Sequence, residues 1–331
     1  MASTLGIAIL GAGRAGAGHA RAAASIPGTQ VVAVFDADAE RAAAFGETHG
    51  CQAFTDLEAL LALSEVNVVT VALPNFLHES AAVAAASAGK HVFLEKPMAD
   101  TLEECDRILA AVEGAGVQLL VGHSQRYFAS TVRARELLHS GALGPPVFAT
   151  DTWYKPFGVA GRLPWFLDRA TGGGMWLMNG AHMIDRTCWV LDSSVASVRA
   201  WIGSPFHGLP ADDACMALLR LRNGLHATIV HAGYKARGVE RCEVEVTCSD
   251  GMLLFDSYSG RLAVDRGGTY EPVVVDPVDP FAAELQNLVC AIRGEEEVRV
   301  PPRWGRHIVE VLLAAEESAR TGREVAIASQ D

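Results

Sequence analysis

The chain has 331 residues, of which 50% are hydrophobic and 20% are charged, a composition that favours well-buried cores over disorder. Because this length exceeds that of one ordinary core, we expect two domains. The formal net charge of −12 argues against nucleic acid or an anionic membrane as a partner, since an acidic surface attracts neither. The apolar N-terminus lacks a basic segment and soon meets glycines, so it indicates a strand rather than a signal peptide, and no run reaches the length of a membrane span.

Cysteine and histidine spacing narrows the class further. The seven cysteines are scattered and contain no Cys-x-x-Cys pair, which favours reduced thiols and a cytoplasmic protein. The eleven histidines show no H-x-x-x-H spacing, so we expect no metal site.

The first third of the chain alternates short apolar runs with helix-like segments. The predicted strands are Leu5–Leu10, Val31–Phe35, Val66–Ala72, His91–Leu94 and Gln118–Gly122. The predicted helices between them are Gly18–Ser25, Ala39–Gly46, Glu79–Ala88 and Leu102–Ala115, the last with Thr101 as its N-cap. Short, fully apolar strands separated by helices are typical of a parallel sheet covered on both faces. We therefore expect an α/β domain over residues 1–124.

The pattern changes after residue 124, where the strands become longer and alternate in polarity. They are predicted at Val147–Tyr154, Val195–Ile202, Cys215–Leu221, Leu225–Ala232 and Cys242–Cys248. Asn223-Gly224 between two of them is a strong hairpin signal. Helices are predicted at Thr131–His139 and Arg306–Thr321. We expect residues 125–331 to form an α+β domain for substrate binding and oligomerisation. Its large, mostly antiparallel sheet would be open on one face, through which a homodimer or homotetramer forms.

A glycine-rich turn follows the first predicted strand and opens a helix. It reads Gly11-Ala-Gly13-Arg14-Ala15-Gly16, the G-x-G-x-x-G spacing of a dinucleotide-binding Rossmann domain. Gly11 is expected to make the tight turn. Gly13 is expected to let the backbone approach a pyrophosphate, and Gly16 to allow close packing of helix on strand. We predict that the whole turn, Arg14 and Ala15 included, contacts the cofactor.

Asp36 ends the second predicted strand, twenty residues beyond Gly16, where a dinucleotide site requires an acid for the ribose. Its carboxylate should accept hydrogen bonds from the adenosine ribose and repel a 2′-phosphate, which favours NAD over NADP. Arg14 and Arg41 lie near enough in sequence to reach such a phosphate, so NADP is the alternative cofactor.

The strand His91–Leu94 runs directly into Glu95-Lys96-Pro97. The carboxyl end of a parallel strand is where ligands bind in an open sheet. Since lysine is almost never fully buried without a partner, Lys96 at this position suggests chemistry. Pro97 restricts the backbone of Lys96 and helps to aim its amine, and the bond between them is one at which a cis peptide is affordable. A structural salt bridge between Lys96 and Glu95 is the other interpretation.

Four motifs occur in one ordered series. They are Gly11-x-Gly13-x-x-Gly16-x-x-His19, then Ala72-Leu73-Pro74-Asn75-x-x-His78, then Ala88-Gly89-Lys90-His91-Val92-x-x-Glu95-Lys96-Pro97, and finally Gly172-Gly173-Gly174 to Gly180-x-His182-x-x-Asp185. The series resembles the glucose–fructose oxidoreductase, inositol dehydrogenase and rhizopine-catabolism (Gfo/Idh/MocA) family over nearly the whole chain. The resemblance implies a Rossmann domain, an open-faced antiparallel sheet domain, and NAD(P)-linked oxidation or reduction of sugars and cyclitols.

The resemblance also assigns residues. It carries the family's catalytic lysine to Lys96 and its histidine to His182. The cofactor-binding residues that it implies outside the glycine turn are Ala72, Pro74, Asn75, His78, Glu95 and Lys96. Because hydride transfer from an alcohol leaves a hydroxyl proton, we interpret His182 as the general acid/base and Lys96 as the group that polarises the reacting oxygen. The two roles exchanged, or a core or capping role for His182, are the alternatives.

One position departs from the family pattern. Family dehydrogenases often carry an aspartate four residues before the histidine, and here that position is Met178, which cannot accept a proton. Asn179 is adjacent but on any regular element points elsewhere. The candidate substrate contacts are Arg126, Tyr154, Trp165, Met178, Asn179 and Asp185. Of these, Arg126 either touches substrate or fastens the domains, and Asp185 either orients His182 or pairs with Arg186 or solvent.

The sequence therefore predicts an NAD(P)-dependent oxidoreductase acting on the hydroxyl or carbonyl carbon of a small sugar, cyclitol or related polyol. A trans-dihydrodiol or hydroxy-aromatic dehydrogenase of the same fold is the alternative enzyme, compatible with Met178 and the apolar pair Trp165-Phe166. A catalytically silent NAD-sensing regulator is the alternative from another class, and the retention of Lys96 and His182 argues against it.

Overall fold

The computed structural model describes residues 4–236, 238–265 and 267–328. It divides into two compact units, the first made of Met1–His123 and Asp279–Arg306, the second of Ser124–Val278 and His307–Asp331. The segment Asp279–Arg306 thus belongs with the first unit, because the chain returns to it after forming most of the second unit. The predicted single boundary after residue 124 does not include this return. Helix α8 (Pro280–Ile292) of this segment places Leu285 and Leu288 in the same buried cluster as Ile7 of the N-terminal strand, which explains the return.

The first unit contains a six-stranded parallel sheet in the order β3-β2-β1-β4-β5-β6. Its strands are β1 (Leu5–Leu10), β2 (Thr29–Phe35), β3 (Gln52–Phe54), β4 (Val66–Val71), β5 (His91–Leu94) and β6 (Leu119–Val121). Its helices besides α8 are α1 (Arg14–Ser25), α2 (Ala39–His49), α3 (Leu57–Leu61), α4 (His78–Ser87) and α5 (Leu102–Ala115). The predicted Rossmann sheet is confirmed. Its strand order reverses between β1 and β4, the point at which such sheets bind ligands.

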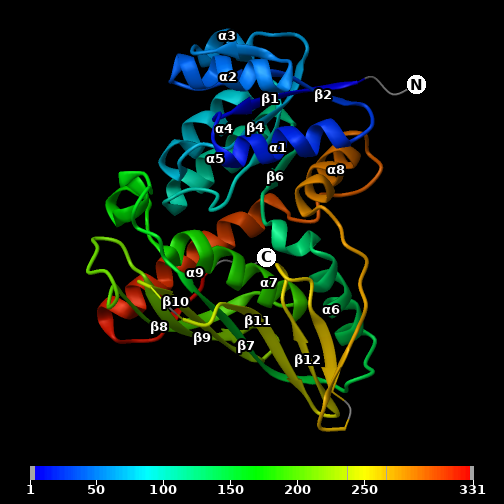
Figure 1. Cartoon of the computed structure of the whole chain (residues 1–331), viewed down its shortest axis with the longest axis vertical. Coiled ribbons are helices and arrows are strands. Elements are labelled where there is room, and N and C mark those ends of the chain that lie inside the picture. Colours follow the sequence, from blue (N-terminus) through cyan, green and yellow to red (C-terminus); the bar gives the residue numbers. More distant parts are fainter. Residues whose placement is uncertain (1–3, 237, 266, 329–331) are drawn as a thin grey trace. The chain divides into compact units, whose positions relative to one another are not determined.

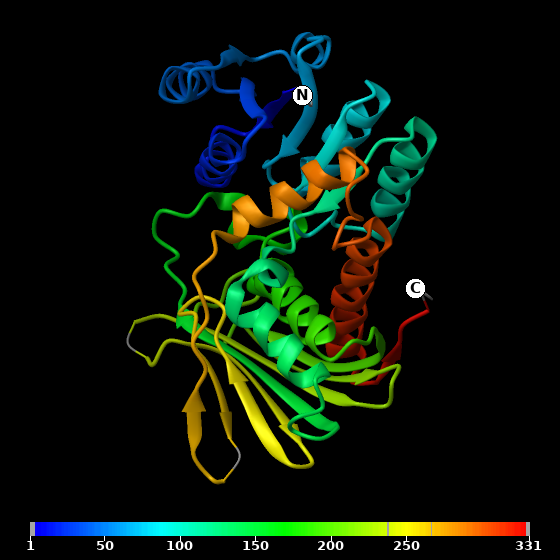
Figure 2. The ribbon, with the colours of Figure 1, turned by 90° about the vertical axis from the view of Figure 1, so that its right-hand side faces the viewer.

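Helices cover both faces of this sheet. Helices α1 and α8 pack together, and their apolar side chains join the inward residues of the strands, among them Ile9, Val68 and Phe93 (Figures 1 and 2). Helices α4 and α5 lie side by side on the opposite face. Helix α5 begins as the sequence predicts, because Thr101 and Glu104 form a reciprocal capping box, and it ends at Gly116 in the left-handed conformation.

Glu284 on α8 is an unusual member of this interior. Its side chain is 1% exposed, and its Oε2 accepts no hydrogen bond from any described residue. Burial raises the pKa of the Glu284 carboxyl well above its ordinary value, and the nearby charges of Glu95 and Asp279 raise it further. Above pH 4.5 the unfolded chain therefore releases the proton of Glu284 before the folded protein does.

Replacing Glu284 with glutamine is expected to stabilise the protein increasingly as the pH rises above 4.5, the ordinary pKa of this carboxyl. A raised folded-state pKa gives stability that is fully present below the unfolded pKa and is lost as the pH rises toward the folded value. Within that window, the difference in unfolding free energy between E284Q and wild type grows by about 1.4 kcal/mol per pH unit. Urea denaturation from pH 4.5 to 8.5 measures it, with exposed Glu296→Gln as the control. A difference that does not change with pH contradicts a protonated Glu284.

The second unit contains a nine-stranded sheet in the order β14-β13-β12-β11-β7-β10-β9-β8-β15. Its strands are β7 (Pro146–Pro156), β8 (Val195–Gly203), β9 (Ala214–Leu221), β10 (His226–Tyr234), β11 (Arg241–Cys248), β12 (Gly251–Phe255), β13 (Leu262–Asp265), β14 (Tyr270–Pro272) and β15 (Val325–Ala326). Strands β7 and β10 pair in parallel and the other pairs are antiparallel, as the mostly antiparallel prediction requires. The predicted hairpin at Asn223-Gly224 joins β9 to β10.

One face of this sheet is covered and the other is open. Helices α6 (Ala129–His139) and α7 (Ala181–Val190) pack on the inner face, and α9 (Pro302–Thr321) lies beside α7 (Figure 2). The strands alternate accordingly, with buried Leu219 next to exposed Leu218 on β9. Large apolar side chains are exposed on the outer face, namely Phe148, Trp201, Met216 and Leu218. The predicted open-faced sheet is confirmed.

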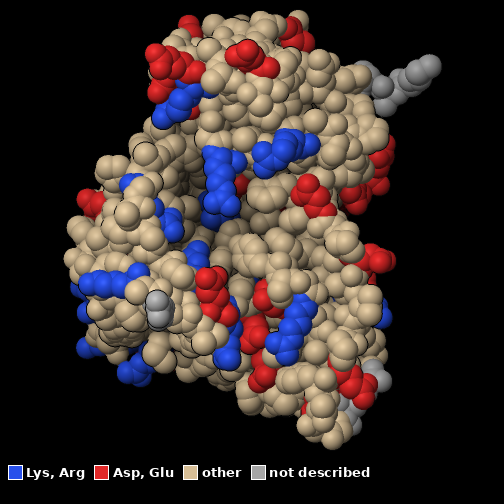
Figure 3. Space-filling view, in the orientation of Figure 1, with Lys and Arg blue, Asp and Glu red and all other residues tan. Residues whose placement is uncertain are grey.

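The described residues bear on three expectations from composition. None of their helices is long and apolar enough to cross a membrane. All seven cysteines are free. The described part of the chain holds no group of three or more His, Cys, Asp or Glu side chains arranged to bind a metal ion. On the face drawn in Figure 3, neutral residues cover most of the surface, and Lys and Arg lie among Asp and Glu.

Candidate active site

The glycine turn between β1 and α1 has the form that the sequence predicts. Gly11 has φ +101°, and a Cβ there would lie 2.5 Å from the carbonyl oxygen of Ala72. A Cβ at Gly16 would lie 2.0 Å from the carbonyl oxygen of Gly11, so only glycine permits this packing of helix on strand. Gly13 has no atom within 4 Å of its Cβ position and is exposed, as are Arg14 and Ala15. The backbone at Gly13 is therefore open to a ligand at the start of α1.

Asp36 at the end of β2 reaches back to this turn. Its Oδ2 accepts a hydrogen bond from the backbone N–H of Ala12 (3.0 Å), and its Oδ1 accepts from the N–H of Asp38 (2.9 Å) and from Nη2 of Arg41 (2.7 Å). Burial alone would raise the pKa of Asp36, but these hydrogen bonds outweigh it and hold the pKa below its ordinary value. An ionised carboxylate has about four lone-pair sites, and Asp36 accepts three hydrogen bonds here. It can therefore still accept a hydrogen bond from a ribose hydroxyl.

Two loops at the carboxyl edge of the sheet are tied together by predicted site residues. His78 at the start of α4 is buried, with Nε2 2.9 Å from the carbonyl oxygen of Leu73 and Nδ1 2.9 Å from that of Pro97. Burial lowers the pKa of His78, and the two carbonyl oxygens offset part of that shift. Asn75 donates from Nδ2 to Oδ1 of Asp100 (2.9 Å). His78 and Asn75 therefore fix the loops that follow β4 and β5, on which Ala72, Pro74 and Lys96 stand.

Glu95 and Lys96 follow β5 as predicted, and the peptide bond from Lys96 to Pro97 is cis. Oε1 of Glu95 lies 2.8 Å from Nε2 of the buried His19, and Oε2 accepts the backbone N–H of Lys96 at 3.2 Å. Burial alone would raise the pKa of Glu95, yet His19 and then Lys96 lower it to about 2, so this carboxylate is ionised at neutral pH. Burial lowers the pKa of the half-buried Lys96 amine, and Glu95 offsets part of that shift.

His19 is a site residue to which the sequence analysis gave no role. It lies on α1 one turn after Gly16, on the helix face toward the sheet. Its ring packs against Phe93 of β5 and Phe281 of α8, with centroids 4.7 and 5.3 Å away. The signal was the spacing Gly16-x-x-His19, which directs a polar side chain into an apolar interface.

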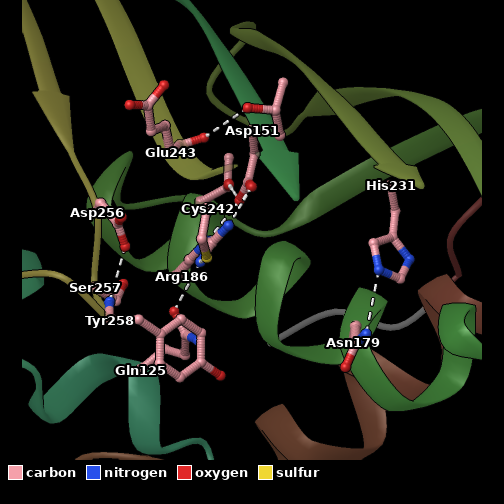
Figure 4. A network of polar contacts seen from close by, with 12 residues as sticks. Gln125, Asp151, Asn179, Arg186, His231, Cys242, Glu243, Asp256, Ser257 and Tyr258 are labelled. Atoms are coloured by element: carbon pink, nitrogen blue, oxygen red, sulfur yellow. Dashed lines mark hydrogen bonds and ion pairs between the residues drawn. The ribbon is translucent and has the colours of Figure 1, made fainter. Parts of the chain in front are cut away.

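In the second unit, His182 stands on the first turn of α7, directly after the π-helix Trp176–Gly180. Its ring lies on the inner face of the sheet, 6.3 Å from the Trp153 ring between centroids. Asn179 donates from Nδ2 to Nε2 of His231 on β10 at 3.2 Å (Figure 4). The expectation that Asn179 points elsewhere was wrong, because it assumed a regular helix. The π turn brings Asn179 and His182 to the same face of the sheet.

Two buried ion pairs hold α7 in place. Arg126 donates from Nε to Oδ1 of Asp185 (2.8 Å), and its Nη2 lies 2.7 Å from the same oxygen as an ion pair, within this unit. Arg186 pairs instead with Asp151 of β7 and donates from Nη1 to Gln125 and Cys242 (Figure 4). Because Arg126 and Asp185 both belong to the second unit, their contact does not test whether Arg126 fastens the two domains. Arg186, which was one of the partners proposed for Asp185, forms its ion pair with Asp151.

The remaining predicted substrate residues are dispersed in the second unit. Tyr154 alternates with the inward Trp153 along β7 and so faces the outer side of the sheet, away from His182. Trp165 lies on the short turn Pro164–Leu167, with its ring 5.2 Å from that of Phe166. Met178 is half-buried within the π-helix. The structure thus places His182 and His231 beside Trp153, with Asn179 bonded to His231, and leaves Tyr154 outside this group.

A Rossmann unit with an open dinucleotide turn, paired with an open-faced sheet unit, defines a two-domain class of nucleotide-dependent oxidoreductases. The chain belongs to the Gfo/Idh/MocA family. Residues 5–123 match the family's oxidoreductase domain with an NAD-binding Rossmann fold, and residues 131–254 match a Gfo/Idh/MocA C-terminal domain.

The chain has relatives of several activities. It is 34% identical over 335 residues to an inositol 2-dehydrogenase of Saccharopolyspora erythraea, covering 96% of this chain and 94% of the relative. It is 34% identical over 179 residues to a 1-carboxy-3-chloro-3,4-dihydroxycyclohexa-1,5-diene dehydrogenase of Comamonas testosteroni, covering 54% of this chain and 45% of that protein. The aldose–aldose oxidoreductase of Caulobacter crescentus, solved with glycerol, superposes with a TM-score of 0.87 at 26% identity over 98% of this chain and 99% of that one.

Proposed function

We propose that this protein is an NAD-dependent dehydrogenase or reductase that transfers a hydride between nicotinamide C4 and a CH–OH carbon of a sugar, cyclitol or related polyol. The observation that carries the proposal is the Glu95-Lys96 pair at the carboxyl end of β5. A lysine of lowered pKa beside an ionised carboxylate, at the ligand-binding edge of a Rossmann sheet, is suited to hold a reacting oxygen.

The residues of this chain divide the reaction between them. Bound at the glycine turn, with its ribose at Asp36, the nicotinamide cofactor supplies the hydride acceptor or donor. In the oxidative direction, Lys96 donates a hydrogen bond to the substrate oxygen and stabilises the negative charge that develops there. His182 takes the hydroxyl proton as the hydride leaves carbon, and it returns that proton in the reductive direction. Asn179 and Trp153 set the position of the His182 side of the substrate.

The preference for NAD rests on Asp36. Replacing Asp36 with serine is expected to lower the ratio of kcat/KM for NAD to that for NADP about tenfold to a hundredfold, the loss expected for hydrogen bonds to a charged group. Arg41, whose side chain is 58% exposed, would then be released to meet a 2′-phosphate. Initial rates with both cofactors measure the ratio, and Arg41→Met, which keeps Asp36, is the control. A wild-type enzyme that prefers NADP would contradict this role of Asp36.

The substrate class is supported from two directions. An inositol dehydrogenase is among the relatives that align over nearly their full length, which favours a polyol. A cyclic diol dehydrogenase is the second candidate. It is favoured by Met178, which offers no hydrogen-bonding oxygen to a further hydroxyl, and by the partial match to a dihydroxycyclohexadiene dehydrogenase.

The experiment that tests the proposal is NAD reduction, followed by NADH absorbance, with a panel of sugars, inositols and cyclic diols. Turnover of at least one class at a kcat typical of enzymes, about 1 s⁻¹ or more, supports it. Tight binding of NADH with no turnover across the panel would instead favour an NAD-sensing regulator.

We place the enzyme in the cytoplasm, in agreement with its seven free cysteines, and expect a homodimer or homotetramer. The open face of the sheet supports the formation of an oligomer. Trp201 of β8 pairs directly with Met216 of β9 on this face, and both side chains are at least half exposed. Light scattering measures the assembly, and a monomer at micromolar concentration contradicts it.

A further inference from the structure

The three consecutive glycines 172–174 lie just before the π-helix Trp176–Gly180. Gly174 has φ +110°, and a Cβ there would lie 2.2 Å from Oδ1 of Asp212. Glycine at this position therefore makes room for the carboxyl group of Asp212. This residue stands two positions before the start of β9, and the proposed reaction gives it no role.

Asp212 holds the start of the π turn through two of its oxygens. Oδ2 accepts a hydrogen bond from the backbone N–H of Trp176 (2.8 Å), and the carbonyl oxygen of Asp212 accepts from the N–H of Met175 (3.2 Å). Met175, at the N-cap position of this turn, supplies no side-chain cap of its own. Asp212 thus satisfies two N–H groups of the kind that a helix start leaves without intrahelical partners.

The same turn is anchored by Trp176 and leads to the proposed acid/base. Trp176 is fully buried, and its Nε1 donates to the carbonyl oxygen of Leu312 on α9 (3.0 Å). From this start the π turn runs to Asn179, which donates to His231 (Figure 4), and then to His182 on the first turn of α7. Because helical hydrogen bonds tie each residue to one four or five positions earlier, a shift of the start is passed on to Asn179 and His182.

The carboxyl group of Asp212 is buried among groups of the same sign. Asp212 is 8% exposed, and burial raises the pKa of its carboxyl group to about 7, although the N–H of Trp176 opposes this shift. The charged and titratable groups around it are Glu316 of α9 with its partner Arg169, the adjacent Asp213, and the thiol of Cys215 on β9. Ionisation of Asp212 strengthens the hydrogen bond that it accepts from Trp176.

We propose that Asp212 is a positioning residue, which sets where the π turn begins and so places Asn179 and His182 on the inner face of the sheet. This inference rests on the proposed function, because it concerns the residue that we interpret as the acid/base. Gly174 belongs to the same arrangement, since a side chain there would displace the carboxyl group of Asp212.

The kinetic test compares Asp212→Ala, which removes the acceptor, with Asp212→Asn, which keeps an acceptor oxygen of the same reach. It is made at about pH 6, below the pKa of about 7 of Asp212, so that asparagine matches the protonated carboxyl group. D212A is expected to lower kcat about tenfold to a hundredfold with the Kd for NADH unchanged, the loss that a small displacement of a catalytic group causes. D212N should keep most of the wild-type kcat. Asp56→Ala, which removes the exposed cap of α3 in the first unit, should keep all of it.

A second readout needs no substrate. The chain has five asparagines, so protein labelled with [15N]asparagine gives five side-chain amide signals in the NMR spectrum, and Asn179→Ala identifies that of Asn179. In D212A at the same pH this signal is expected to move, because the hydrogen bond to His231 changes, whereas in D212N and D56A it should stay.

If circular dichroism shows that D212A does not fold, the wild type is titrated instead. As the pH rises through about 7, the Asn179 signal is expected to move by a step that D212N lacks. The absence of such a step, or a step that D212N shares, overturns the positioning role.

The outcomes separate the two proposals. A folded D212A with the wild-type kcat, a D212N as impaired as D212A, or an Asn179 signal that does not move in D212A overturns the positioning role and leaves the proposed function standing. If the wild type turns over no compound of the panel, the proposed function fails, and the Asn179 signal alone decides on Asp212.

Discussion

Replacing Lys96 with methionine is expected to lower kcat by about 10²–10⁴-fold while the Kd for NAD changes little. The amine is half-buried at the end of β5, its pKa is lowered by burial, and its neighbour Glu95 is fixed by His19. Removing it takes away the donor that we place on the reacting oxygen but leaves the glycine turn and Asp36 intact.

Replacing His182 with alanine should lower kcat by a similar factor, with a smaller effect on KM.

Steady-state kinetics with NAD titrations by fluorescence measure both effects. Lys96→Arg refines the interpretation, because arginine keeps the charge but does not release a proton at neutral pH. Substantial activity in K96R would indicate that Lys96 acts through its charge. Loss of activity in K96R would indicate that Lys96 transfers a proton or that the site requires the shape of the lysine side chain. A K96M enzyme with near-normal kcat refutes the catalytic role of Lys96.

Replacing Arg186 with methionine is expected to reduce the free energy of unfolding of the second unit by about 3–5 kcal/mol, the cost of leaving one member of a buried ion pair unpaired. Arg186 is fully buried and binds Asp151 through two nitrogens. Burial alone would lower the pKa of Arg186, but Asp151 raises it, so the guanidinium is charged. In the variant, Asp151 would keep only the Thr187 hydroxyl as a donor among these contacts.

Urea denaturation followed by circular dichroism measures the loss. The double variant Arg186→Met, Asp151→Asn should recover part of it, because the unpaired charge is then gone. A single variant within about 1 kcal/mol of the wild type would show that this pair does not hold α7 on the sheet.

The positions of the candidate cofactor residues at the ends of strands were predictable because their signals are local. The turn from Gly11 to Gly16, Asp36 at the end of β2 and Lys96 at the end of β5 follow from strand boundaries and residue type alone. Most long strands of the second unit were also found, since alternation and the Asn223-Gly224 turn are short-range patterns.

What failed depended on long-range contacts or irregular backbone. The return of α8 to the first unit depends on Leu285 and Leu288 meeting a sheet that begins at residue 5. The choice of Asp151 as the partner of Arg186 joins residues 35 apart, whereas the sequence analysis considered only the neighbouring Asp185. The π turn before α7 has no distinct sequence signal, and it moved Asn179 to the face that His182 shares.

The measurement that tests the central claim most directly is isotope transfer. Wild-type enzyme is incubated with NAD and a polyol deuterated at its CH–OH carbons, and the NADH formed is examined by mass spectrometry. The account predicts NADH that carries one deuterium, with its formation slowed by the label and reduced about 10²-fold or more in K96M. NADH without deuterium, or no NADH from any substrate on the panel while NAD is bound, would contradict it.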